Sequence, residues 1–85
     1  MASNILHDEI TAEVTRLLQQ HRLELKMSKS VLAERSGLSR RMIGFVEKQE
    51  RNPTLDTLLR ITGALNIPLE DILSEARKAA IRRTR

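Results

Sequence analysis

The sequence predicts an all-α fold of five helices, and three observations support that prediction. Phe45 is the one aromatic residue among 85, so the core has to be built from Leu, Ile, Val, Met and Ala. This composition favours helices, because strands are rich in aromatic and β-branched residues. Apolar residues recur at helical spacing, and Ser, Thr, Gly and Pro divide them into five segments. A chain of this length forms one domain at most.

The first predicted helix runs from Asn4 or Asp8 to Leu25. Residues 1–9 are polar, and we expect them to form an N-terminal extension that can fray. The apolar residues of this helix are spaced mostly by three, four and seven positions, which places them on one stripe. They are Ile10, Val14, Leu17, Leu18 and Leu25.

The second predicted helix spans residues 29–36. Ser28 precedes it and can accept hydrogen bonds from the first free backbone N–H groups, as an N-cap does. Met27 and Leu32 occupy the two positions of a hydrophobic staple around that cap. Gly37 ends the helix, because glycine readily takes the left-handed conformation found at helix ends.

The third predicted helix repeats this pattern after a tight turn. Leu38 and Ile43 form the staple, Ser39 is the cap, and the helix runs from Arg40 to about Lys48. Two short helices joined by so short a turn have the sequence form of a helix-turn-helix.

The fourth and fifth predicted helices complete the chain. The fourth starts at the cap residue Thr54, and a broad buried stripe is expected to hold Leu55, Leu58, Leu59, Ile61, Thr62 and Leu65. The fifth starts near Pro68, with Glu70 and Asp71 in its first turn, where the helix dipole favours acids. It carries Ile72, Leu73 and Ala76 and is expected to continue into the basic tail. The expected division is an extension over 1–9, a helix-turn-helix domain over 10–74 and a basic helical tail over 75–85.

Basic charge is concentrated in two blocks of the sequence. Residues 26–51 hold seven basic and three acidic residues, and residues 75–85 hold five basic and one acidic. The two remaining stretches are each net acidic, and the whole chain has a net charge of +4. The blocks fit either a solvated surface or an electrostatic footprint for a polyanion.

Residue types around the predicted turn satisfy the demands of a helix-turn-helix. Ala33 is small where the two helices cross, and Gly37 tolerates a positive φ at the start of the turn. On a helical wheel with about 100° per residue, Met42, Ile43 and Val46 fall on one apolar face of the third helix. The expected core contains Leu18, Leu32, Ala33, Leu38, Ile43, Val46, Leu58, Ile61, Leu65 and Ile72.

The opposite face of the third helix is suited to reading DNA. An α-helix fits the major groove, where Arg can bond guanine O6 and N7 together and an apolar side chain can contact the thymine methyl group. Phe45 would make that apolar contact, although it could instead belong to the core. Gly44 would let the helix approach the bases closely. The groove-facing set is Ser39, Arg40, Arg41, Gly44, Phe45 and Lys48.

The run SKSVLAERSGLSRRMIGFVEKQERNPTL, residues 28–55, resembles the helix-turn-helix domains of phage repressors and Cro proteins, the XRE family. The resemblance covers roughly residues 14–73 and implies a lambda-repressor-like fold and a sequence-specific transcription regulator. The length of the chain is similar to Cro-like repressors and to small restriction–modification controllers. Two positions depart from the family: Lys29 stands where Gln is usual, and Gln49 stands where Gly usually follows the recognition helix.

The resemblance also implies roles for residues outside the third helix. Ser28 and Lys29 correspond to phosphate contacts at the start of the second helix, and Arg51 and Asn52 to phosphate contacts in the loop after the third. Arg22 and Glu47 correspond to a structural ion pair, and we expect their charged groups to lie within about 4 Å of each other.

We expect a twofold homodimer, because one recognition helix contacts too few base pairs for adequate specificity. The candidate interface is on the last helix, at Leu69, Ile72, Leu73 and Ile81. A second class of function stays open, in which the same fold serves as an antitoxin or as a bridging factor that binds a toxin or the transcription machinery. The basic tail could be a solvated helix end or an extra arm that binds DNA or RNA. Its basic residues are Arg77, Lys78 and those within 82–85.

Other chemistries have little support in the sequence. His7 and His21 lack partners at ligand spacing, the carboxylates are scattered, and there is neither a cysteine nor a glycine-rich phosphate loop. We therefore expect no enzyme activity, no metal and no cofactor. A cytoplasmic location is expected, because no apolar run approaches the roughly 20 residues that cross a bilayer and no signal peptide is apparent.

Overall fold

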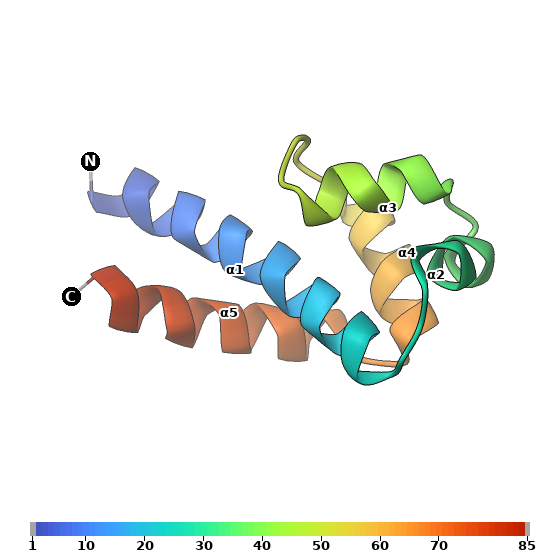
Figure 1. Ribbon diagram of the computed structural model, residues 1–85. Helices are drawn as coiled ribbons and strands as arrows, with labels where there is room; N and C mark the ends of the chain where they lie inside the picture. Colours follow the sequence, from blue (N-terminus) through green and yellow to red (C-terminus); the bar gives the residue numbers. More distant parts are fainter. Residues whose placement is uncertain (1, 85) are drawn as a thin grey trace.

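The computed structural model describes residues 2–84 and, within them, the side chains from residue 5 onward. It contains five helices in that range and no strand, so the all-α prediction is confirmed. The helices are α1 (Ala2–Glu24), α2 (Lys29–Ser36), α3 (Arg40–Glu47), α4 (Leu55–Leu65) and α5 (Leu69–Thr84). In Figure 1, α2, α3 and α4 form a cluster at one end of the paired helices α1 and α5. No helix in the described range is long and apolar enough to span a membrane.

The predicted N-caps of the three central helices are all present. The hydroxyl oxygens of Ser28, Ser39 and Thr54 accept hydrogen bonds from the backbone N–H groups of Val31, Met42 and Thr57, at 3.1, 3.0 and 3.1 Å. These bonds satisfy donors that have no partner within a helix, which explains why each helix begins where it does.

A single core joins the cluster to the long helices. Leu17 and Leu18 of α1 pack with apolar residues from α2, α3, α4 and α5, all of them almost completely buried. The predicted core is confirmed except at Leu38 and Leu58, which are only partly buried against it. The buried members from the other helices are Leu32, Ala33, Ile43, Val46, Ile61, Leu65, Ile72 and Ala76.

Three leucines that were expected on buried stripes are exposed. Leu55 is 64% exposed and Leu59 is 52% exposed, so the buried face of α4 is narrower than the sequence pattern indicated. Leu25 is 53% exposed, because α1 ends at Glu24 and the chain has already turned away from the core. Apolar spacing identifies the side of a helix that can be buried, but neighbouring helices decide how much of it is covered.

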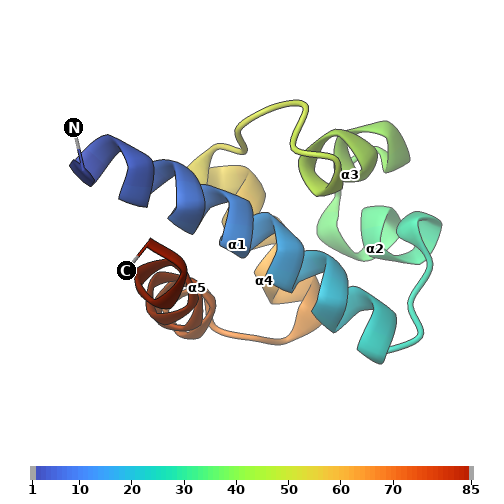
Figure 2. The same cartoon turned by 60° about the vertical axis from the view of Figure 1, so that its left-hand side comes forward.

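The helix α1 begins at Ala2 rather than at Asn4 or Asp8, and its first turns pair with the end of α5. Both views show the two helices side by side, with the N- and C-termini at the same end (Figures 1 and 2). Arg83 of α5 reaches Glu9 at 3.2 Å and Glu13 at 2.6 Å. The side chain of Glu13 is 1% exposed and also pairs with Arg16 at 2.9 Å. These contacts hold together the two segments that were expected to be an extension and a tail.

Candidate nucleic-acid interface

The turn between α2 and α3 has the geometry that the sequence predicted. Gly37 has a φ of +74°, and the backbone N–H of Leu38 donates to the Ala33 carbonyl at 3.1 Å. A Cβ atom at this glycine would lie 3.2 Å from Nη1 of Arg60, and a side chain would also strain the backbone. Ala33 is 7% exposed where the helices approach each other. The turn therefore fixes how α3 is presented on the surface.

The third helix has one buried and one outward face. Ile43 and Val46 are 0% and 1% exposed, and they anchor α3 from below. The predicted groove-facing residues are all on the other side: Ser39, Arg40, Arg41 and Lys48 are exposed, and Gly44 and Phe45 are half-buried. A Cβ atom at Gly44 would meet no atom within 4 Å, so packing inside the molecule does not require glycine there.

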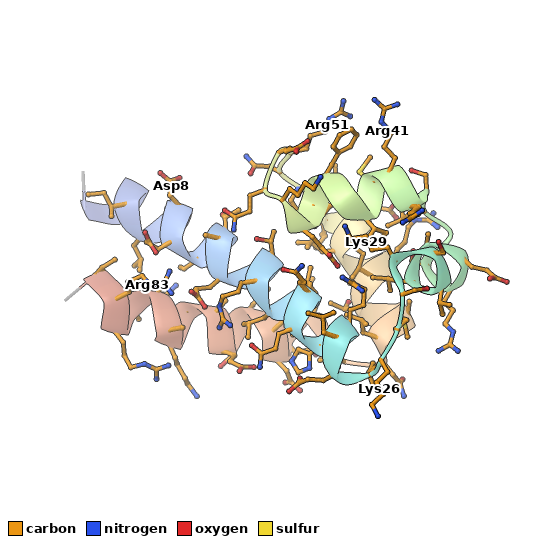
Figure 3. All side chains as sticks on the ribbon, in the orientation of Figure 1. Asp8, Lys26, Lys29, Arg41, Arg51 and Arg83 are labelled. Atoms are coloured by element: carbon orange, nitrogen blue, oxygen red, sulfur yellow. The ribbon has the colours of Figure 1, made fainter. Side chains whose placement is uncertain are left out.

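Phe45 lies beneath two arginines instead of in the core. The guanidinium carbon of Arg51 is 4.5 Å from the centroid of its ring, and that of Arg41 is 5.4 Å away. Figure 3 shows Arg41 of α3 and Arg51 of the following loop together on the side of α3 that faces away from α1. The spacing of four residues between Arg41 and Phe45 is visible in the sequence, but the contact with Arg51 was not expected, because it depends on the path of the loop after α3.

The residues expected to contact phosphate lie on two different segments. Ser28 is exposed and Lys29 half-buried at the N-terminal end of α2, whereas Arg51 and Asn52 are exposed in the loop between α3 and α4. The Ser28 and Ser39 hydroxyl oxygens accept capping bonds, which leaves the hydrogen of each hydroxyl available to donate to a phosphate or a base. Gln49 takes a left-handed conformation with a φ of +59°, the conformation for which glycine is favoured.

The predicted ion pair between α1 and α3 is present. Nε of Arg22 donates to Oε2 of Glu47 at 2.7 Å, and Nη2 donates to Oε1 at 2.9 Å. Nη1 of Arg22 also donates to the Met27 carbonyl at 2.8 Å. The two side chains are 7% and 4% exposed, so the pair is shielded from water. It connects the long helix to the end of α3 and to the segment before α2.

The second basic block lies away from this surface. Arg77, Lys78 and Arg82 are exposed on α5, which lies across α1 from α3 in both ribbon views (Figures 1 and 2). Arg83 is engaged with Glu9 and Glu13, a pairing that the sequence did not indicate because the partners are far apart in the chain. The basic tail therefore does not extend the outward face of α3. Within the described residues, no three His, Asp or Glu side chains are grouped so that they could hold a metal ion.

Comparisons with known proteins agree with this geometry. A family described as helix-turn-helix matches residues 18–72. The chain is 44% identical over 66 residues to the control protein C.SmaI of Serratia marcescens, covering 78% of this chain and 75% of that protein. It is 39% identical over 62 residues to the HTH-type transcriptional regulator SutR of Escherichia coli K12, covering 73% of this chain. The chain spans only 35% of the length of that regulator.

Solved structures of one controller share the fold. The wild-type restriction–modification controller protein C.Esp1396I superposes with a TM-score of 0.75 at 27% identity, over 87% of this chain and 95% of that one. A variant of the same controller, bound to its highest-affinity operator site, has a TM-score of 0.77 at 26% identity, over 86% and 96% of the two chains.

Proposed function

The chain belongs to the helix-turn-helix family, and from that membership we propose that it binds double-stranded DNA through the major groove and regulates transcription. The observation that carries the proposal is the outward face of α3. Arg40, Arg41 and Lys48 are exposed there, and none of them pairs with a carboxylate among the described side chains. A helix with such a face fits the major groove and offers its donors to base edges.

The base-reading set is the outward face of α3. Arg40 and Arg41 lie in its first turn, and each has a planar fork of donors that can select guanine. Gly44 allows close approach to the bases, and Phe45 offers an apolar surface for a thymine methyl group. Ser39 and Lys48 complete the set at the two ends of the helix.

Phosphate contacts hold the protein in register on the duplex. Ser28 and Lys29 lie at the start of α2, where free N–H groups and the helix dipole favour an anion. Arg51 and Asn52 provide the corresponding contacts from the loop after α3. These contacts fix position and orientation but carry no sequence information directly.

The protein acts as a twofold homodimer in this proposal, with half-sites about one helical turn, ~10 base pairs, apart. Leu69 and Ile72, which were candidates for the interface, are 8% and 1% exposed and belong to the protein's own core. Their side chains are therefore not available to a second copy. The other two candidates, Leu73 and Ile81, are 42% and 36% exposed.

For the proposed dimer, α4 offers a better-placed candidate interface than α5. Leu55 and Leu59 lie one turn apart on that helix and are more exposed than either α5 candidate. They follow soon after Asn52, so a contact between two copies at this point would bring the two DNA-facing surfaces together. Sedimentation of Leu59→Glu should show a loss of dimer, whereas Leu73→Glu should sediment as the wild-type protein does. The opposite result would move the interface to α5.

The proposed function is tested by comparing two basic residues with different expected roles. The probe is a duplex selected from random DNA by the wild-type protein, together with its single-base variants. Replacing Arg41 by Ala should cost roughly 1–3 kcal/mol on the selected site and flatten discrimination at one base pair per half-site. Replacing Lys29 by Ala should lower the affinity for all sequences almost equally. It should also reduce the salt slope, the dependence of log affinity on log salt concentration, by about one for each phosphate that is no longer neutralised.

A matched control is Arg77→Ala, which removes an exposed arginine from α5 and should leave the preference among sites unchanged. If Arg41→Ala weakens all sequences uniformly while Lys29→Ala changes base preference, the assignment of the reading face is wrong. If neither replacement affects DNA binding, a protein partner of the kind bound by antitoxins or bridging factors becomes the better hypothesis.

A further inference from the structure

We propose that Phe45 is a positioning residue that holds the guanidinium groups of Arg41 and Arg51 over one ring, and so couples base reading to phosphate contact. The inference rests on the proposed function for its consequence on DNA. The arrangement itself is a property of the free protein and is tested separately below.

The ring is the common contact of two side chains that come from different segments. Arg41 lies one helical turn before Phe45 within α3, and Arg51 lies in the loop that follows the helix. Their guanidinium carbons are 5.4 and 4.5 Å from the ring centroid, within the distance of about 6 Å at which a cation is attracted to an aromatic face. Phe45 therefore connects the reading helix with the loop.

No acidic side chain competes with the ring for these arginines. Among the side chains of residues 5–84, neither Arg41 nor Arg51 forms an ion pair. Two positive charges next to one ring repel each other, and no carboxylate in the described part of the chain lies within ion-pair distance of either guanidinium. An anion placed between or above them would relieve the repulsion. The free surface is thus arranged to receive phosphate and guanine acceptors together.

Preorganisation explains how the ring would strengthen binding. A long arginine side chain loses rotamer freedom when it is fixed against DNA, and ordering it beforehand reduces that loss at the moment of binding. In the proposal the ring orders both arginines, which Figure 3 shows on the same side of α3. When one arginine binds DNA, it also fixes the position of the ring against which the other arginine packs.

The role that the proposed function gives to Phe45, direct contact with a thymine methyl group, is a competing explanation for its importance in binding. That role needs the ring but not the two arginines. It also predicts an effect confined to positions occupied by thymine, with no change in the number of phosphates neutralised. The two roles therefore differ in their dependence on Arg41 and Arg51 and in their salt dependence.

The first experiment titrates Phe45 variants against the duplex selected by the wild-type protein, at several salt concentrations. Phe45→Leu keeps an apolar side chain without a ring face, and Phe45→Tyr keeps the face. Without the two exposed cation–π interactions, fewer free molecules have both arginines in place, and the affinity of Phe45→Leu should fall by about 5- to 30-fold at most. Its salt slope should fall by up to about one for each copy bound, because Arg51 is less well placed. Phe45→Tyr should keep the affinity and the salt slope of the wild-type protein.

A double-mutant cycle supplies the decisive comparison. In a background carrying Arg41→Ala and Arg51→Ala, Phe45→Leu should change affinity by less than about twofold, because the coupled partners are absent. If Phe45→Leu still causes its full loss of affinity in this background, the proposal is overturned. If that loss then disappears on a duplex with uracil in place of thymine, the ring reads a methyl group instead. Thermal unfolding of each variant separates these effects from loss of the fold.

The second experiment needs no DNA. In the NMR spectrum of the free protein, the Nε–Hε resonances of Arg41 and Arg51 should carry ring-current shifts that Phe45→Leu abolishes and Phe45→Tyr retains. Unchanged resonances in Phe45→Leu would overturn the proposal even if the protein binds DNA well. If the wild-type protein selects no duplex, the proposed function fails, and these resonances still decide whether the ring positions the two arginines.

Discussion

Breaking the ion pair between Arg22 and Glu47 should be among the most destabilising single changes in this chain. Glu47→Gln removes the negative charge while leaving Arg22 with its bond to the Met27 carbonyl at 2.8 Å and no charged partner. Because the two side chains are 7% and 4% exposed, water cannot replace the missing carboxylate without opening the structure. Breaking a pair buried to this degree costs about 3–5 kcal/mol.

That loss is large relative to the whole stability of a domain of this size. At about 0.05–0.15 kcal/mol per residue, an 85-residue domain is stable by roughly 4–13 kcal/mol. The melting temperature of Glu47→Gln should fall on the order of 12–40 °C, since each kcal/mol corresponds to roughly 4–8 °C for a domain of 60–100 residues. Urea unfolding followed by circular dichroism measures the change directly.

The double replacement Arg22→Met with Glu47→Leu is the informative control. Apolar side chains of similar volume can replace a buried ion pair without loss, because no charge is left unpaired. We expect the double variant to lose only about 1–3 kcal/mol, because the buried Met27 carbonyl loses its donor, while Glu47→Gln loses more. A loss of less than about 1 kcal/mol for Glu47→Gln, or additive losses in the double variant, would refute the reasoning.

Three further changes test other parts of the fold. Gln49→Gly should raise the free energy of unfolding by roughly 0.5–1 kcal/mol, because a φ of +59° strains any side chain with a Cβ atom; a lower urea midpoint would contradict this. Arg83→Ala should lower the free energy of unfolding by about 1–3 kcal/mol, since the buried Glu13 keeps only Arg16 as a partner. The rate of amide hydrogen exchange in α5 should rise as well. Ala33→Leu should cost about 1–3 kcal/mol by overfilling the crossing of α2 and α3, and an unchanged melting temperature would show that the crossing is loose.

Local features of the fold could be predicted from sequence because they depend on neighbouring residues. Ser28, Ser39 and Thr54 cap helices through bonds that span three residues, so their effect is already contained in a short stretch of sequence. Gly37 could be placed in the turn for the same reason. The starts of α2, α3 and α4 followed from these caps.

Features that depend on distant segments could not be predicted in this way. The extent of α1 is tied to α5, which lies at the other end of the chain, and the buried position of Glu13 depends on Arg83. The exposure of Leu59 likewise depends on which helices cover α4. Sequence spacing gives the direction in which a side chain points, but not the presence of a neighbour in that direction.

In the candidate site, too, some features could be predicted from the sequence and others depend on segments that it does not place. The outward set of α3 followed from the helical wheel, and the pair between Arg22 and Glu47 followed from the family resemblance. The position of Arg51 over Phe45 depends on a loop whose path includes the left-handed Gln49. A loop conformation of this kind has no periodic signal in sequence.

The distribution of charge has a consequence for how DNA binding should respond to salt. The two basic blocks do not merge into one surface, because α5 lies across α1 from α3 in both ribbon views (Figures 1 and 2). Part of the second block is also neutralised internally, since Arg83 pairs with Glu9 and Glu13. The salt slope counts only the phosphates that basic side chains neutralise. It should therefore reflect the basic side chains of α2, α3 and the following loop, and the exposed basic side chains of α5 should add little to it.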